Sequence, residues 1–274
     1  MTETAVVITR YPARRGATWL REAYGMLARA RLRWLGLLAI YYLAMSLIEL
    51  LPFIGSSAAL VLKPIFGVGF LAAAWAQERG ELPVPRHLFL GFRANLWALI
   101  PLGLFLFIGI RLSLAATVLV DDGQLLDVLA GRAELNESTV ASGQLQQSML
   151  LSAACATPVL LAMFYAPALV VFHGCGVTRA LSLSLKATLA NWRPFTVYAL
   201  LLMCFGLVVP LFVLAMCVLV LPRDAALVLS AVSLLPYFAL LFAMLNIADY
   251  VSYRDIFHAG ESADSASMTT TAVA

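Results

Sequence analysis

Four ionisable side chains lie inside or at the edges of long apolar segments, where charged groups are unfavourable and often functional. Lys63 and Arg111 lie within such segments, and Glu49 and Asp249 lie near segment ends. A cation at membrane depth could hold an anionic substrate or a lipid headgroup, and Asp249 could couple proton movement. Lys63 could instead pair with Glu49 or extend toward the headgroups. Arg111 could likewise extend outward, and Asp249 could pair with a nearby arginine.

Other residues of chemical interest do not form a recognisable site. The four cysteines, Cys155, Cys175, Cys204 and Cys217, are scattered, and His173 with Cys175 supplies too few ligands for a metal. The sequence also lacks phosphate-binding loops, dinucleotide fingerprints, and zinc-protease or serine-hydrolase motifs. We therefore expect no catalytic residues, no metal, no cofactor and no enzymatic activity.

The composition indicates the elements that must position these charges. Hydrophobic residues make up 62% of the 274 residues, charged residues make up 12%, and the mean hydropathy is +0.92. Soluble domains carry about 25% charged residues. Six stretches reach the roughly 20 apolar residues that a span needs: about 34–51, 54–76, 96–120, 149–172, 195–221 and 225–250. The sequence predicts an all-α fold, a polytopic bundle of six transmembrane helices with amphipathic cytoplasmic interfacial helices.

The distribution of basic residues predicts the orientation of the spans. Fourteen of the 18 Lys and Arg residues fall in the N-terminal arm, the second and fourth connections and the tail. The positive-inside rule therefore places both termini in the cytoplasm. We divide the chain into a basic arm with an amphipathic helix (1–33), a transmembrane domain (34–250) and a cytoplasmic tail (251–274) that is disordered after about residue 258. An outer loop, about 121–147, carries five acidic residues and one arginine.

Three cytoplasmic segments share a pattern of apolar residues at three- and four-residue spacing with Arg or Lys between them. They are 16–27, 86–97 and 178–192. Such helices lie in the headgroup plane with their cations toward anionic lipid. A tryptophan placed as an interfacial anchor accompanies each segment, and an internal proline that could kink the helix occurs in each even-numbered span. The anchors are Trp34, Trp97 and Trp192, and the kink sites are Pro64, Pro167 and Pro236. The pattern fits either a true threefold repeat or convergence among similar hairpins.

Several short motifs occur in an order that resembles a known family. They are 34–38 (WLGLL), 51–55 (LPFIG), 74–79 (AWAQER), 91–93 (GFR), 165–169 (YAPAL), 191–192 (NW) and 252–257 (SYRDIF). The chain thereby resembles uncharacterised six-span inner-membrane proteins of beta-proteobacteria that end in a SYRDIF-like motif. The resemblance implies a bacterial inner-membrane location and a six-helix fold. It supplies no activity, ligand or catalytic residue.

These observations favour an integral inner-membrane protein that organises lipid or interacts with a partner without catalysing a reaction. A transporter or exporter of a small anionic or lipidic solute is the alternative. The expected partners are membrane lipids with anionic headgroups at the cytoplasmic face, because the arginines of the arm alternate with apolar residues. No nucleic-acid partner is expected, and a protein partner or oligomeric state does not follow from the sequence.

Overall fold

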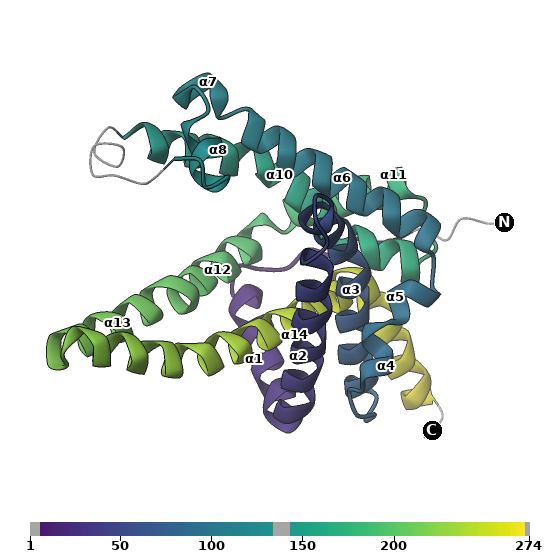
Figure 1. Cartoon of the computed structure of the whole chain (residues 1–274). Helices are drawn as coiled ribbons and strands as arrows, with labels where there is room; N and C mark the ends of the chain where they lie inside the picture. The colour runs from purple at the N-terminus through teal and green to yellow at the C-terminus, as the bar shows by residue number, and fades with distance from the viewer. Residues whose placement is uncertain (1–5, 134–142, 272–274) are drawn as a thin grey trace. The chain divides into compact units, whose positions relative to one another are not determined.

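The computed structural model describes residues 6–133 and 143–271, and every regular element in these ranges is helical (Figure 1). The all-α fold predicted from the sequence is therefore confirmed. Contacts divide the chain into two compact units, which we describe separately. The first unit comprises Met1–Leu47, Phe66–Arg93 and Ala187–Ala274, and the second comprises Ile48–Ile65 and Ala94–Lys186.

Six helical segments are long and apolar enough to cross a membrane. They are Arg31–Glu49, Gly55–Glu78, Leu96–Asp121, Gln144–Phe172, Trp192–Val220 and Asp224–His258. The six predicted spans are confirmed, and their ends differ from the predicted ones by several residues. The sixth span is longer than predicted because its helix continues past the last apolar residues.

The helices that form and connect these spans follow one another closely along the chain. The first two spans are α2 (Arg31–Glu49) and α3 (Gly55–Glu78), preceded by α1 (Arg15–Arg29) and followed by the short α4 (Pro85–Leu88) and α5 (Leu90–Arg93). The third span is α6 (Leu96–Ala115) with α7 (Val118–Asp121), and α8 (Gln124–Leu129) follows it. The later helices are α10 (Gln144–Phe172), α11 (Val177–Ala190), α12 (Trp192–Met203), the π-helical segment η1 (Cys204–Val208), α13 (Val209–Val220) and α14 (Arg223–Thr271).

Two elements differ from the sequence prediction. α14 remains helical to Thr271, although a disordered tail was predicted after about residue 258. Residues 259–271 contain no proline, although eight of the thirteen are Gly, Ser, Thr or Asp, which are weak helix formers. The predicted segment 86–97 divides into α4, α5 and the start of α6 instead of forming one amphipathic helix.

In the first unit, α1 packs against α12 and α14. Its buried residues follow the helical spacing that the sequence showed, and Trp19 is fully buried among them. An interfacial helix would place this apolar face in lipid, whereas here it contacts protein. Gly16 permits the close approach, because a Cβ at this position would lie 2.1 Å from the backbone oxygen of Pro194.

The second unit is centred on the contact between α6 and α10. Gly103 lies so close to the preceding span that a Cβ would lie 2.1 Å from the Val61 oxygen. Near Pro167, the Ser184 hydroxyl accepts a hydrogen bond from the Tyr165 N–H and donates one to the Leu161 oxygen, each at 2.9 Å. A side chain that bridges these groups inserts into the regular helical ladder one turn before Pro167.

Prolines are not confined to the even-numbered spans. Pro64, Pro167 and Pro236 lie inside α3, α10 and α14, as the sequence indicated. Pro101 also lies inside α6, and Pro210 begins the helix after η1. Proline therefore does not distinguish one class of span from the other.

The acidic loop is partly ordered by its own carboxylates. The buried Asp121 side chain accepts hydrogen bonds from the backbone N–H groups of Gly123 and Leu125, each at 3.0 Å, and so satisfies donors at the start of α8. Asp127 pairs with Arg132 at 2.8 Å. Glu134 and Glu137, which contribute to the predicted acidic character, lie outside the described residues.

Candidate functional site

The ionisable residues singled out within the first four spans do not form a site. Lys63 and Glu49 are both exposed, and neither makes an ion pair with any described residue. The Lys63–Glu49 pair, one of the alternatives that the sequence left open, is therefore not observed. Arg111 is also exposed, and its guanidinium carbon lies 5.9 Å from the centre of the Phe107 ring. Both cations can therefore extend along the helix surface.

Asp249 has a different partner from the one expected. The hydroxyl of Tyr198 on α12 donates a hydrogen bond to its Oδ1 at 3.2 Å. Among the described residues no arginine forms an ion pair with this carboxylate, so the predicted salt bridge is not observed. Asp249 thus joins the fifth and sixth spans by a single hydrogen bond.

The three predicted tryptophan anchors divide into two groups. Trp97 and Trp192 are 91% and 59% exposed, as an interfacial anchor requires. Trp34 is fully buried, stacks on Phe70, and donates its indole N–H to Gln77 Oε1 at 2.7 Å. The prediction is therefore wrong for Trp34, because a buried indole cannot contact headgroups. Its role is to fasten the start of α2 to the end of α3.

A cluster of charged residues instead forms where α1 meets the end of the sixth span. Asp255 lies at its centre with a side chain only 6% exposed. Its Oδ2 accepts hydrogen bonds from Arg15 Nε at 2.5 Å and from the Trp19 indole N–H at 2.9 Å. Its Oδ1 accepts one from Arg254 at 3.1 Å. The hydrogen bond to Asp255 raises the pKa of Arg15 above its ordinary value, so Arg15 stays charged.

The same cluster extends from α14 to α3. Arg254 also pairs with Glu22 on α1 at 2.8 Å and with Glu78 at the end of α3, and the Tyr250 hydroxyl donates to Glu78. Glu22 in turn pairs with Arg15 at 2.9 Å. Every charge of the cluster therefore has an opposite partner, and it joins three helices. We call Arg15, Glu22, Glu78, Arg254 and Asp255 the ionic cluster.

The segment before α1 is attached to the same region. The Thr9 N–H donates to the Ile256 oxygen at 2.9 Å, and the Asn191 side chain bonds the backbone of both Thr9 and Tyr11. Burial and the nearby Asp255 carboxylate raise the pKa of the Tyr11 hydroxyl, which donates to the Asp255 backbone oxygen at 3.2 Å. The N-terminal segment thus lies on the C-terminal end of the last span.

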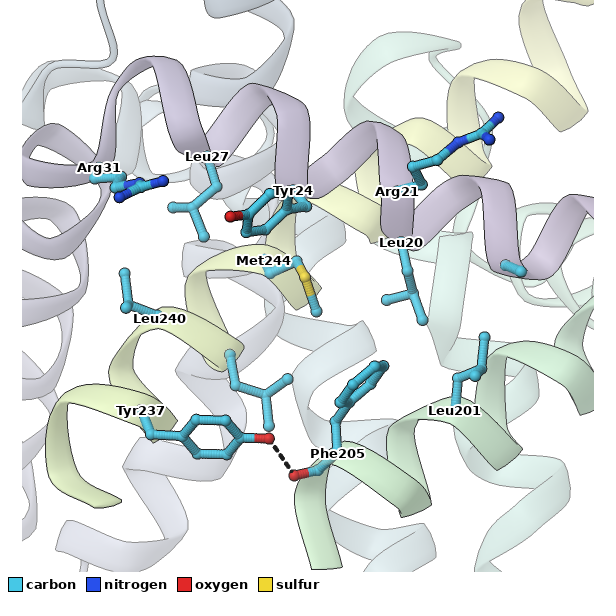
Figure 2. A pocket seen from close by; sticks show the side chains of 12 residues that line it. Leu20, Arg21, Tyr24, Leu27, Arg31, Leu201, Phe205, Tyr237, Leu240 and Met244 are labelled. Carbon is cyan, nitrogen blue, oxygen red and sulfur yellow. Dashed lines mark hydrogen bonds between the residues drawn. The ribbon is translucent and has the colours of Figure 1, made fainter. Parts of the chain in front are cut away.

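On another side of α1, a cavity of about 630 Å³ opens toward α12, η1 and α14 (Figure 2). We call it the apolar pocket. Leucines of α1 face the leucine and methionine side chains of α14 across it, and its polar side chains are few. Its lining residues are Ala17, Leu20, Arg21, Tyr24, Leu27, Arg31, Leu201, Phe205, Tyr237, Leu240, Leu241 and Met244. A cavity of this size lies within the range of small-molecule sites.

The wall of the apolar pocket contains the π-helical segment η1. Phe205 belongs to this segment, and its backbone oxygen accepts a hydrogen bond from the Tyr237 hydroxyl at 2.6 Å (Figure 2). A π-helical turn leaves a carbonyl outside the regular ladder and often marks a functional site. The Tyr237 hydroxyl thus satisfies a carbonyl that would otherwise face an apolar space.

The sequence is similar to that of a probable inner membrane protein of Burkholderia thailandensis. The two are 30% identical over 251 residues, which cover 89% of this chain and 92% of the relative. The chain belongs to this inner-membrane protein family. No family model matches the chain, and no solved structure matches it. Together with the six apolar helices, this relationship identifies a multi-pass inner-membrane protein of unknown activity.

In this inner-membrane protein, several motifs noted in the sequence meet at the ionic cluster. Segment 74–79 supplies Glu78 and segment 252–257 supplies Arg254 and Asp255, whereas Asn191 of the NW pair binds the N-terminal segment at Thr9 and Tyr11. Sequence reasoning singled out these motifs but did not assign the cluster to them. The signal was available in the rare polar residues next to the ends of spans, whereas their partners on α1 were not identifiable.

A second cavity, of about 580 Å³, lies beside the ionic cluster. Glu22, Glu78 and Arg254 line it together with Arg29 of α1 and the loop after α3. The cluster residues at its wall already pair with one another and Glu81 pairs with Arg86, so Arg29 is the one lining residue whose charge has no ion-pair partner among the described residues and is open to a ligand. The apolar pocket is therefore the better candidate for a functional site.

Proposed function

We propose that this inner-membrane protein is a non-enzymatic, lipid-organising protein that holds anionic lipid at its cytoplasmic face. The observation that carries the proposal is a set of exposed arginines on and around α1, two of which, Arg21 and Arg31, line the apolar pocket. Arg14, Arg21, Arg29, Arg31 and Arg33 are exposed, and none forms an ion pair with a described residue. Each cation near an anionic membrane surface contributes about 1 kcal/mol of attraction.

The proposed orientation places both termini in the cytoplasm. Its support is the excess of Lys and Arg in the connections on one side. The contact between Thr9 and Ile256 agrees with a shared side for both ends of the chain. Protease treatment of inverted membrane vesicles carrying a C-terminal epitope tests it, because an epitope protected from digestion would contradict the proposal.

The first prediction concerns the two arginines at the apolar pocket. Replacing Arg21 and Arg31 together by glutamine is expected to weaken retention of phosphatidylglycerol by about tenfold or more, since two favourable charges of about 1 kcal/mol each are lost. Native mass spectrometry of protein extracted with its own lipids measures the retained lipid. The matched control is Arg132→Gln, which removes an exposed arginine paired with Asp127 in the acidic loop. Equal retention by all three proteins would contradict the proposal.

Transport or export of a small anionic or lipidic solute is the alternative function. The observation that favours it is Lys63, an exposed cation within the second span that has no ion-pair partner among the described residues. However, Lys63 lines neither of the two cavities described above. The proposed lipid-organising function therefore does not require this lysine.

The second prediction separates these two functions. Lys63→Met is expected to leave the retained lipid unchanged within about twofold, because the side chain lies outside the apolar pocket and a methionine suits an exposed apolar helix surface. Native mass spectrometry of the wild type and the variant measures the difference. A retained anionic lipid or solute that disappears in Lys63→Met would make Lys63 a binding residue and favour transport.

A further inference from the structure

We propose that the apolar pocket holds one acyl chain of a diacyl anionic phospholipid, with the lipid phosphate at Arg31 and Tyr24. This inference rests on the proposed function and adds the chemical class and pose of the ligand. It differs from adsorption at the membrane surface, because one chain lies between α1 and the last two spans instead of among the surrounding lipids.

The interior of the pocket has the chemistry of a hydrocarbon site. Leu20 and Leu27 of α1, Leu201 of α12, and Leu240 and Met244 of α14 contribute side chains to it (Figure 2). The flexible methionine can adapt to an irregular chain. The step from Leu240 to Met244 along α14 is about 6 Å at 1.5 Å per residue, so several methylene groups fit along this wall.

A hydrogen-bonded pair lines the end of the pocket opposite α1. Tyr237 of α14 and Phe205 of η1 lie there, joined by the hydrogen bond from the Tyr237 hydroxyl to the Phe205 oxygen (Figure 2). Because that hydroxyl already has its acceptor, it presents little polarity to the interior. The polar end of a ligand therefore finds its partners on the side of α1.

The α1 side offers the complementary charge. Arg31 and Tyr24 are exposed and line the pocket, and in Figure 2 the Tyr24 hydroxyl points toward the Arg31 end. An arginine and a hydroxyl suit the oxygens of a phosphate. The Arg21 guanidinium points away from the interior in the same view, so we assign it to longer-range attraction. An uncharged lipid would leave this end without its charge partner.

The test uses photocrosslinking in nanodiscs of phosphatidylglycerol that carries a diazirine in one acyl chain. In the wild type we expect labelling on peptides that contain Leu201, Phe205 and Leu240. Leu240→Trp fills the pocket and is expected to lower this labelling by about fivefold or more. Leu235→Trp is the matched control on the same helix, because Leu235 is 76% exposed and does not line the pocket. Its labelling is expected to stay within about twofold of the wild type.

Further variants test whether a loss of labelling comes from filling the pocket and not from misfolding. Leu201→Phe fills the same space from the opposite wall and is expected to lower labelling in the same way. Arg31→Gln is expected to lower it by about fivefold, which corresponds to one charge at the membrane surface. Labelling is compared only among variants whose melting temperature in detergent matches that of the wild type. Loss of labelling in both pocket-filling variants and in Arg31→Gln supports the pose.

Three outcomes would overturn the inference. Undiminished labelling in both pocket-filling variants would show that the chain lies elsewhere. Equal labelling over all lipid-facing helices would show that no chain is held. Stronger labelling by a diazirine fatty acid than by the phospholipid would reject the diacyl ligand. In each case, the proposed lipid-organising function is tested by a separate experiment. That experiment is the native mass spectrometry of retained phosphatidylglycerol in the variant with Arg21 and Arg31 replaced by glutamine.

Discussion

Replacing Asp255 by alanine is expected to lower the free energy of unfolding by about 3 kcal/mol. The side chain is almost fully buried and accepts hydrogen bonds from Arg15, Trp19 and Arg254. Removing the carboxylate leaves the Trp19 indole N–H without an acceptor. It also takes one negative partner from Arg15 and from Arg254. Both arginines keep Glu22 as an ion-pair partner. The expected loss of stability is therefore near the low end of what breaking a buried ion pair costs.

The melting temperature in detergent measures this effect. For a chain of this size, about 3 kcal/mol corresponds to a decrease of roughly 5–10 °C. The matched control is Glu81→Gln, since the Glu81–Arg86 pair is exposed at 3.9 Å and should change stability by less than about 0.5 kcal/mol. Increased trypsin cleavage between α1 and α2 in Asp255→Ala would show that α1 has detached. Equal melting of Asp255→Ala and Glu81→Gln would contradict a stabilising role for the cluster.

A pair of glycines on α1 gives the second large effect. Gly16→Ala is expected to destabilise the docking of α1 by about 3 kcal/mol, because the new Cβ would lie 2.1 Å from the Pro194 oxygen and a backbone must move. Gly25→Ala is expected to stabilise the protein by about 0.5–1 kcal/mol, because nothing lies within 4 Å of a Cβ there and alanine favours a helix.

The two alanine variants differ in composition from the wild type by the same single methyl group. Melting temperatures that shift in opposite directions would therefore show that the α1–α12 contact, and not helix propensity, governs the result. Because α1 forms one wall of the apolar pocket, Gly16→Ala should also lower the retention of phosphatidylglycerol. Two variants that melt at the same temperature would contradict the close packing at Gly16.

The spans were predictable from the sequence because hydrophobicity over about 20 residues depends on the local sequence alone. The surface pattern of α1 was predictable for the same reason, since buried Trp19 and Met26 follow helical spacing. The target of that face was not predictable. An apolar helical face beside arginines suits lipid and protein equally, and only tertiary contacts show that it packs on α12 and α14.

The ionic cluster was beyond sequence reasoning for a related reason. Arg15 and Asp255 are separated by 240 positions, and nothing in their local sequence connects them. Lys63 and Glu49 stand out in the sequence because charged residues are rare in apolar segments, yet both are exposed and form no ion pair among the described residues. A charge at a span end has a nearby loop or surface helix to pair with, whereas a charge within a span depends on neighbours that the sequence does not reveal.

The attachment of the N-terminal segment to the end of the last span has a consequence for biosynthesis. The ribosome makes α1 before its partner Asp255, which follows Arg15 by 240 residues. At about 5–20 residues per second, the interval is roughly 10–50 s. During that time the apolar face of α1 has no docking site on α14, and the membrane surface is available to cover it. The face of α1 that packs on α14 therefore passes from a lipid-covered state to a protein-covered one only after Asp255 is made, which makes the complete docking of α1 a late step of assembly.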